Sequence, residues 1–246
     1  MTTPITASDA AEETQQAQMP LSGHLAELRN RLIWSILAIG LGSMVGFYLG
    51  DELIAILRAP LPPNVPLILL DVTGAFSIRL QVSLVVGVVL AMPVILFHVW
   101  RFVAPGLTAS ERRSVLPWIP ISLLFFLLGV SIAYIIMPFA VTFLLSFVLE
   151  GVDPTIQLGS YFSFVTSLFL AFGILMEFPI LLIGLSRVNI VTSELLSRSR
   201  RMVILVIALF SAVATPGGDL VSPTILGVTL YILFEATVLF IRRTGR

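Results

Sequence analysis

The 246-residue chain contains no cysteine and no lysine, and it has only two histidines. The lack of cysteine excludes disulfide bonds and thiolate metal ligands. His24 and His98 lie on separate segments without the H-x-x-x-H spacing of a zinc site, so no metal site is predicted. There is also no G-x-S-x-G segment, no glycine-rich phosphate loop and no pair of catalytic carboxylates. The sequence therefore predicts no enzymatic reaction and no cofactor, and nothing in it indicates a nucleic-acid partner.

Charged residues are also scarce. They make up 11% of the chain, against 57% hydrophobic residues, whereas a soluble domain carries roughly 25% charged residues. This composition predicts an integral membrane protein. The first 20 residues are polar and hold acids but no basic residue, unlike a signal peptide or a transit peptide. We therefore expect a disordered tail over residues 1–20 and one membrane domain over residues 21–246.

Long apolar runs are what the sequence has in abundance, and a membrane helix needs about 20 such residues. Six runs or interrupted runs qualify as predicted spans: Leu32–Gly50, Leu80–Trp100, Ser114–Leu149, Gly159–Leu185, Met202–Ala214 and Ile225–Ile241. No internal repeat is visible, so an inverted-repeat transporter plan is not supported.

The third and fifth runs have unusual lengths. The third is too long for one span, and we expect Pro138 to end its helix and leave Phe139–Leu149 at the outer surface. The fifth run, Met202–Ala214, rises only about 20 Å, against a hydrocarbon core of about 30 Å. This predicts a locally thinned bilayer near spans 5 and 6. Ser222 and Pro223 are typical of an N-cap followed by the first helical residue of span 6.

The arginines predict the orientation. Twelve of the fourteen lie before span 1, between spans 2 and 3, between spans 4 and 5, or after span 6. The alternate segments hold only Arg58 and Arg79, together with several acids. By the positive-inside rule both termini are cytoplasmic and the number of spans is even. The expected fold is an all-α membrane protein with six transmembrane helices in a concave arrangement, in which spans 5 and 6 are short.

The segment HLAELRNRL, residues 24–32, places leucines on one helical face and Glu27 four residues before Arg31. This pattern is typical of a short amphipathic interfacial helix with one exposed ion pair. In the second cytoplasmic segment, Thr108 and Glu111 fit a T-x-x-E capping box at the start of span 3. For Glu111, therefore, a purely structural role competes with a binding role.

Glu177 is the only ionisable residue in the stretch 168–185. We expect this carboxylate near the middle of the membrane, where it is costly unless it is protonated, paired or hydrated. Pro179 follows two residues later and predicts a bend in the helix, with Glu177 in a polar notch at that bend. The alternative is a neutral Glu177 hydrogen-bonded to a neighbouring helix. Glu235 lies seven residues before Arg242, so we expect it to pair locally or with another helix near the cytoplasmic side.

Several of these segments, in this order, resemble the TatC family, the multispanning core subunit of the twin-arginine protein translocase. The resemblance runs from about Leu21 to Arg243. It is carried by HLAELRNRL, APL at 59–61, WRFVAPGL followed by ERR, AFGILMEFPI, TPGGD and LFEATVLF. Because six separate motifs share the family's order and topology, the resemblance is specific.

The resemblance implies a receptor for signal peptides with two consecutive arginines, within a translocase that exports folded proteins using the proton-motive force. It implies TatA- and TatB-type single-span partners and an oligomeric complex in the lipid bilayer. Because the first residues do not resemble a transit peptide, it implies the bacterial inner membrane as the location. The family's signal-peptide surface corresponds to Glu27, Glu111, Phe102 and Arg29. Its intramembrane contact with a partner helix corresponds to Glu177, and its outer-loop transport positions correspond to Pro60 and Asp219.

Charge chemistry agrees with the implied ligand, because a guanidinium group binds a carboxylate through two oriented hydrogen bonds. One alternative from another class remains open on the residues alone. A proton-coupled small-solute transporter would use Glu177 and Glu235, the two membrane acids.

Overall fold

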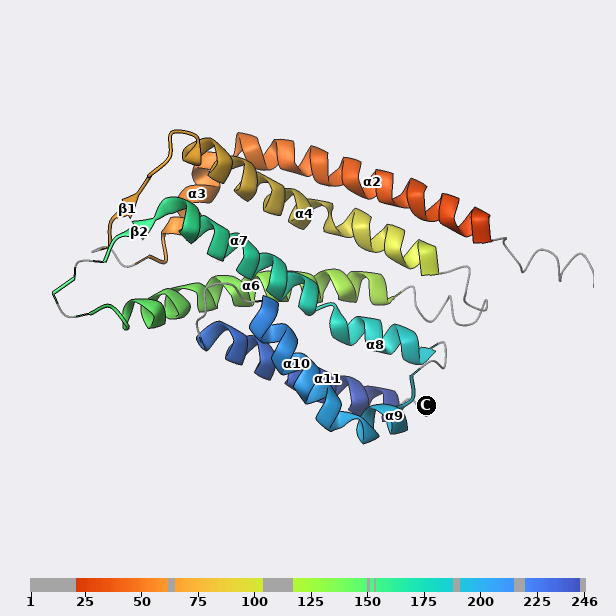
Figure 1. The fold of residues 1–246 in the computed structure, drawn as a ribbon. Helices are drawn as coiled ribbons and strands as arrows, with labels where there is room; N and C mark the ends of the chain where they lie inside the picture. The colour runs from red at the N-terminus through yellow and green to blue at the C-terminus, as the bar shows by residue number, and fades with distance from the viewer. Residues whose placement is uncertain are drawn as a thin grey trace, which may run out of the picture.

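The structure is a computed structural model that describes residues 21–61, 65–103, 117–149, 151–152, 154–187, 191–214 and 220–243. Nearly all of these residues are helical (Figure 1). The elements are, in chain order, α2 (Leu21–Tyr48), α3 (Gly50–Arg58), β1 (Leu67–Ile68), α4 (Gly74–Val103), α6 (Trp118–Leu145), β2 (Ile156–Gln157), α7 (Leu158–Leu175), α8 (Phe178–Arg187), α9 (Ser193–Arg198), α10 (Arg200–Ala214) and α11 (Val221–Arg243). The predicted tail, residues 1–20, lies outside the described residues.

Helices α2 and α4 form a closely packed antiparallel pair (Figure 1). A Cβ atom added at Gly42 would lie 2.8 Å from the Gly87 carbonyl oxygen, and one at Gly46 would lie 2.9 Å from that of Ser83. Small residues at such a crossing let two membrane helices approach backbone to backbone. The separate interfacial helix expected over residues 24–32 is wrong, because α2 is continuous for 28 residues from Leu21. No proline interrupts the segment, and its leucines extend the exposed apolar side of the span.

The predicted first span ends earlier than expected, at Tyr48, and a short helix that the sequence analysis missed follows it. This helix, α3, begins at Gly50. Arg79 of α4 fastens the corner: its guanidinium group donates two hydrogen bonds of 3.1 Å to the Phe47 carbonyl oxygen. The same group pairs with Asp51 at 3.2 Å. Strands β1 and β2 pair in parallel with Leu67 opposite Ile156, which ties two loops together at this end of the molecule.

Pro138 does not end the third span. Helix α6 continues through it to Leu145, so the expectation that residues 139–149 lie separately at the outer surface is wrong. A proline in a membrane helix removes one backbone hydrogen bond, and neighbouring helices and side chains can compensate. Here the residues around it, Met137, Ala140 and Val141, are buried in the core, which holds the helix together on both sides of the proline. The residues before Pro117, where the span was expected to begin, lie outside the described part.

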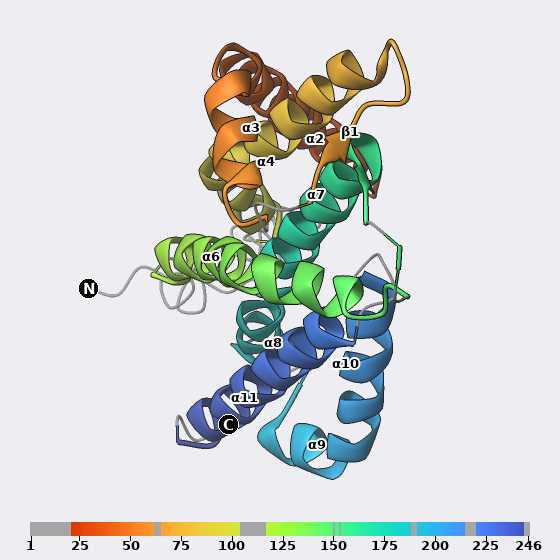
Figure 2. The same ribbon diagram turned by 90° about the vertical axis from the view of Figure 1, so that its left-hand side faces the viewer.

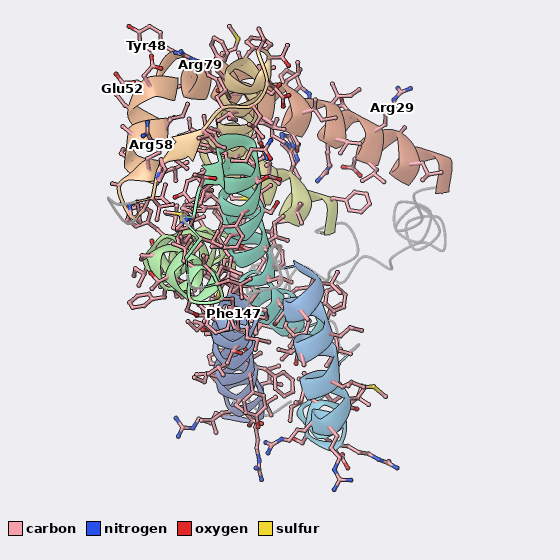
Figure 3. All side chains as sticks on the ribbon, turned by 60° about the vertical axis from the view of Figure 1, so that its left-hand side comes forward. Arg29, Tyr48, Glu52, Arg58, Arg79 and Phe147 are labelled. Carbon is pink, nitrogen blue, oxygen red and sulfur yellow. The ribbon has the colours of Figure 1, made fainter. Side chains whose placement is uncertain are left out.

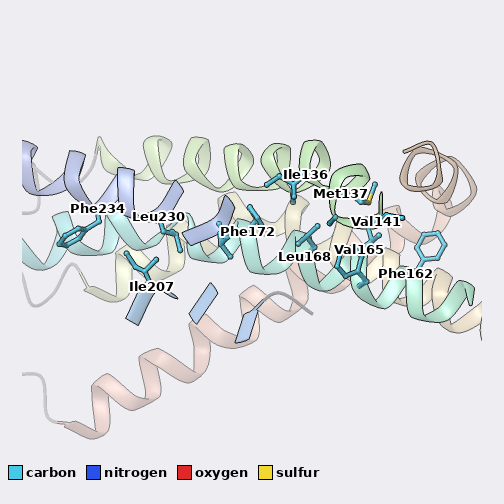
Figure 4. Packing of buried hydrophobic residues seen from close by; sticks show 14 of the residues in the cluster. Ile136, Met137, Val141, Phe162, Val165, Leu168, Phe172, Ile207, Leu230 and Phe234 are labelled. Atoms are coloured by element: carbon cyan, nitrogen blue, oxygen red, sulfur yellow. The ribbon is translucent and has the colours of Figure 1, made fainter. Parts of the chain in front are cut away.

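The fourth predicted span divides into α7 and α8, interrupted at Met176 and Glu177, just before Pro179. The predicted bend is therefore confirmed. The core runs along α6, α7 and α11, where Phe162, Phe172 and Phe234 are fully buried (Figure 4). This core holds the two halves of the broken span in fixed positions.

Helices α9, α10 and α11 lie on the opposite side of α7 from α2, α3 and α4 (Figure 2). Helix α10 has 15 residues and is short, as predicted. Helix α11 has 23 residues, so the expectation of a short sixth span is wrong. It begins at Val221, which makes Ser222 a residue of its first turn and not its N-cap. At its other end it extends through Arg242 and Arg243, whose positive charges are favourable at a helix C-terminus.

Within the described ranges, five helical stretches are long and apolar enough to cross a membrane. They are Leu25–Tyr48, Gly74–Phe102, Trp118–Leu145, Leu158–Ser186 and Val221–Arg243. Helix α10 falls below the length of this group because its 15 residues rise only about 22 Å.

Candidate functional site

The first candidate site lies at the end of the α2–α4 pair and is built around Glu27. A guanidinium nitrogen of Arg31, one turn further along α2, donates to Glu27 Oε1. The predicted i,i+4 pair is thus confirmed, but its predicted exposure is wrong. Arg31 is only 9% exposed, and its other terminal nitrogen donates to the backbone carbonyl oxygen of His98 on α4 at 3.1 Å. Arg31 therefore joins the carboxylate of one helix to the backbone of the next.

The second carboxylate oxygen of Glu27 has a different environment. Oε2 is buried and has no hydrogen-bond partner within the described part of the chain. The Nδ1 atom of His98 is buried and without a partner in the same sense. A buried carboxylate oxygen without a donor is costly, so this oxygen is a site to which a donor group would bind favourably. A carboxylate with one occupied and one available oxygen suits a guanidinium or ammonium ligand.

Phe102 lies on the same end of the helix pair. Helices α2 and α4 run antiparallel, and Arg31 is level with His98. Glu27 lies one turn before Arg31 on α2, and Phe102 lies one turn after His98 on α4. Because the helices are antiparallel, this register places Phe102 at the level of Glu27. Phe102 is half-buried. The structure therefore places two of the predicted signal-peptide residues at the same end of the α2–α4 pair, where Arg31 and His98 also lie.

Arg29 does not join this cluster. Two residues from Glu27 on a helix, it projects from the opposite face of α2 into open surroundings (Figure 3). Pro60 lies just after α3, at the other end of the molecule, and is half-buried. Glu111 and Asp219 lie outside the described residues, as does the predicted capping box of Thr108 and Glu111.

The second candidate site surrounds Glu177 at the break between α7 and α8. The Ser122 hydroxyl group of α6 donates to Glu177 Oε2. Oε1 is buried and has no partner within the described residues. Both backbone groups of Glu177 are paired, because its amide donates to the Ile174 carbonyl oxygen at 3.1 Å and its carbonyl oxygen accepts from the Leu181 amide at 3.0 Å. Glu177 thus has a hydrogen bond to a neighbouring helix and an available oxygen as well.

Close helix packing positions this carboxyl group. A Cβ atom at Gly129 of α6 would lie 2.8 Å from the Met176 side chain, and one at Gly173 of α7 would lie 2.6 Å from the Phe126 ring. Both crossing positions tolerate only glycine without a shift of the neighbours. Ser122 is the fifth residue of α6, so Glu177 is level with the second turn of that helix and not with its middle. The sequence analysis placed this carboxylate closer to the centre of the membrane.

Glu235 belongs to a third, separate cluster. It pairs with Arg200 at the start of α10 at 3.0 Å and accepts a hydrogen bond of 3.2 Å from the Tyr231 hydroxyl group. The expectation that it pairs locally or with another helix is confirmed. A cavity of about 270 Å³ lies beside this pair, between Ser197 and Arg242. Arg200 and Tyr231 together occupy both carboxylate oxygens of Glu235. Glu27 and Glu177, by contrast, each have one buried oxygen without a partner among the described residues.

Sequence reasoning missed two residues of these sites. Ser122 carries no signal in the sequence, because a serine within an apolar run is common in membrane helices. Arg31 was noted only as a neighbour of Glu27, and its contact with His98 depends on the register of α2 against α4. In the described ranges no group of three or more His, Asp or Glu side chains could hold a metal ion.

Comparison with known proteins assigns the family. The profile described as "Sec-independent protein translocase protein (TatC)" matches residues 23–228. The TatC protein of Aquifex aeolicus is 38% identical over 226 residues, covering 89% of this chain and 93% of the relative. That of Escherichia coli K12 is 35% identical over 238 residues, covering 95% and 90%.

A crystal structure described as the twin arginine translocase receptor TatC in DDM superposes with a TM-score of 0.79 at 36% identity. The match covers 89% of this chain and 99% of that one. None of these matches supports the small-solute transporter alternative. The chain belongs to the TatC family of Sec-independent protein translocase proteins.

Proposed function

We propose that this chain is the twin-arginine signal-peptide receptor and core subunit of a translocase that exports folded proteins across the bacterial inner membrane with the proton-motive force. The observation that carries the proposal is the available Oε2 atom of Glu27, at the level of Phe102 along the α2–α4 pair, in a chain of the TatC family. The crystallised relatives are described as receptors of the twin-arginine translocase, which supports the same assignment.

In this proposal, one arginine of the signal peptide binds Glu27 Oε2 and a second binds Glu111. Arg31 positions Glu27, because its hydrogen bond to His98 fixes the guanidinium group and thereby one side of the carboxylate. Phe102 covers the bound guanidinium group, since an aromatic ring can stack on its planar surface. Arg29, on the opposite face of α2, contributes positive charge at the rim and affects binding only indirectly.

We further propose that Glu177 is the contact for a polar group on the membrane helix of a TatA- or TatB-type partner. Its Oε1 atom is available for a donor, and Ser122 holds the other oxygen. Short helix α10 supports an approach from this side, because a 15-residue span allows the bilayer to thin around it. Pro60 and Asp219 remain proposed transport positions on the outer side, and the assembled translocase is oligomeric.

The proposed topology has six spans in a concave arrangement, with α10 as the fifth and both termini in the cytoplasm. The natural absence of cysteine makes this directly testable with single introduced cysteines. Glu52→Cys on α3 and Glu194→Cys on α9 replace exposed side chains. A membrane-impermeant maleimide should label the first on intact spheroplasts and the second only after the membrane is opened. Labelling of both without opening the membrane would contradict this topology.

Signal-peptide recognition is tested by photo-crosslinking a twin-arginine peptide to the protein in membranes. Glu27→Gln with Glu111→Gln should lower the crosslinked fraction about tenfold to a hundredfold, the range expected for losing hydrogen bonds to a charged group. A peptide with two lysines should crosslink more weakly to the wild type, because an ammonium group cannot form the two-pronged contact.

The matched control is Glu194→Gln, which removes an exposed acid from α9 without touching the Glu27 cluster. It should leave crosslinking unchanged. Unchanged crosslinking in the double variant would move recognition elsewhere and leave the capping box as the role of Glu111. No specific crosslink to the wild type would overturn the receptor proposal itself.

A further inference from the structure

An apolar groove of about 540 Å³ opens between four helices, away from the Glu27 and Glu177 sites. Leucines, isoleucines and valines form most of its wall. Representative lining residues are Leu57 of α3, Val86 of α4, Ile135 of α6 and Phe169 of α7. The three longer helices are among those that qualify as membrane spans. The groove therefore faces the hydrocarbon layer and not water.

Polar groups gather at one end of this groove. Tyr134 and Tyr161 direct their hydroxyl groups to the carbonyl oxygens of Ile56 and Leu57, at 3.5 and 2.6 Å. Arg58, the last residue of α3, follows directly and lies near enough to interact electrostatically with the Tyr161 hydroxyl group. Tyr161 is buried, whereas Tyr134 and Arg58 are exposed, and exposed tyrosine and arginine side chains are typical of the headgroup level in membrane proteins.

Arg58 is exceptional among the arginines. Only it and Arg79 lie on the α3 side, where the positive-inside rule disfavours basic residues. Arg79 is accounted for by Asp51 and by the Phe47 carbonyl oxygen. Within the described residues, no carboxylate forms an ion pair with Arg58, whose side chain is exposed. Arg58 lies at the C-terminus of the nine-residue helix α3, where its positive charge interacts modestly with the helix dipole. This interaction does not explain why the exposed guanidinium group lies next to an apolar groove.

The volume of the groove is similar to that of one lipid acyl chain. Its 540 Å³ equals about eighteen groups of the size of water, and a methylene group is of similar size. One acyl chain of about eighteen carbon atoms is therefore of a size to fill the groove along its length.

We propose that this groove is a binding site for one anionic phospholipid, with an acyl chain between α3, α4, α6 and α7 and its phosphate on Arg58. The lipid belongs to the leaflet on the α3 side, the outer leaflet in the proposed topology. The site is independent of the proposed receptor function, because none of its residues belongs to the Glu27 or Glu177 clusters.

The test uses the full-length protein, purified into micelles that contain equal amounts of dioleoyl phosphatidylglycerol and dioleoyl phosphatidylcholine. Native mass spectrometry after washing then counts the retained lipids. The wild type should retain one phospholipid per chain and prefer the anionic one about fivefold, the effect of one interfacial arginine. Arg58→Gln should retain a lipid but lose the preference. Arg201→Gln, at an exposed position of α10, is the matched control and should behave as the wild type.

A second variant tests the chain-binding part of the site. Ser131 lines the groove and is exposed, so Ser131→Trp fills the groove without disturbing the core. It should lose the retained lipid whatever its headgroup. If Ser131→Trp fails to give monodisperse protein, Ile135→Trp, at a position 62% exposed, blocks the same groove.

Three results would overturn the proposal. They are a wild type without headgroup preference, an Arg58→Gln variant that keeps the preference, and a filled groove that still retains the lipid. The competing occupant is a protein helix, either of a partner or of a second copy. A photo-crosslinker on Ser131→Cys, the only cysteine in that variant, should yield no protein adduct in native membranes. A protein adduct would show that a protein helix occupies the groove and would contradict the lipid proposal.

Discussion

The guanidinium group of Arg31 donates a hydrogen bond of 3.1 Å to the backbone carbonyl oxygen of His98 and at the same time pairs with Glu27. One buried side chain thus fixes the end of α2 against α4 and fixes the carboxylate proposed to meet the signal peptide. Folding and recognition depend on the same contact at this position. A change at Arg31 is therefore expected to affect both.

Arg31→Gln should lower both stability and peptide binding. It removes hydrogen bonds of a charged, buried group, each worth about 1.5–3 kcal/mol, and leaves Glu27 without its partner. We expect a lower thermal unfolding midpoint in detergent and a weaker crosslink to a twin-arginine peptide. Arg29→Gln is the stability control, because that side chain is exposed on the opposite face, and its midpoint should match the wild type. An Arg31→Gln variant as stable as the wild type would contradict the bridging role.

Gly87→Ala should disrupt the α2–α4 pair. Its new Cβ atom would lie 2.7 Å from the Ile39 carbonyl oxygen and 2.7 Å from the Ser43 amide nitrogen, neither of which can move without shifting α2. Overpacking of this kind costs about 1–3 kcal/mol. Gly40→Ala is the matched control on α2, since nothing lies within 4 Å of its added Cβ atom. Gly87→Ala should give a lower folded yield and a lower unfolding midpoint than Gly40→Ala. Equal midpoints for the two variants would contradict the close crossing of α2 and α4.

Ser122 and Glu177 should be energetically coupled. Ser122→Ala leaves the Glu177 carboxyl group without its hydroxyl donor, and Glu177→Gln changes the acceptor of the same bond. A double-mutant cycle on unfolding in detergent should therefore show a coupling free energy of about 0.5–3 kcal/mol. Ser131→Ala, on the same helix but exposed, should show no coupling with Glu177→Gln. Additive effects for the Ser122 pair would mean that this hydrogen bond does not form in the membrane.

Five of the six predicted spans correspond to described helices that are long and apolar enough to cross a membrane, because hydrophobic runs report directly on burial in lipid. The bend at Glu177 followed from Pro179, and the short helix α10 followed from the run Met202–Ala214. The i,i+4 pair of Glu27 and Arg31 followed from helical spacing. These features are all local, since each depends on residues within two or three turns of one another.

The features that the sequence did not predict depend on contacts between distant segments. Pro138 ends a helix by its local chemistry, yet tertiary packing carries α6 past it to Leu145. The partner of Glu177 is 55 residues away at Ser122, and the partner of Arg31 is 67 residues away at His98. Register between helices places these groups together, and no pattern within one helix encodes it.

Glu235→Gln should have little effect on either stability or export. Its carboxylate pairs with Arg200, whose side chain is 47% exposed, while its own is 31% exposed. Partly exposed pairs of this kind contribute about 0–1 kcal/mol, and the neutral amide can still accept the hydrogen bond of Tyr231. Export of a folded twin-arginine reporter should proceed near the wild-type rate, whereas Glu177→Gln, which alters the proposed partner contact, should slow it. A proton-carrying role for Glu235 requires the opposite, because an amide cannot take up and release a proton. Complete loss of export in Glu235→Gln, with Arg200→Gln still active, would therefore show that the acid itself is needed and that its ion pair is not.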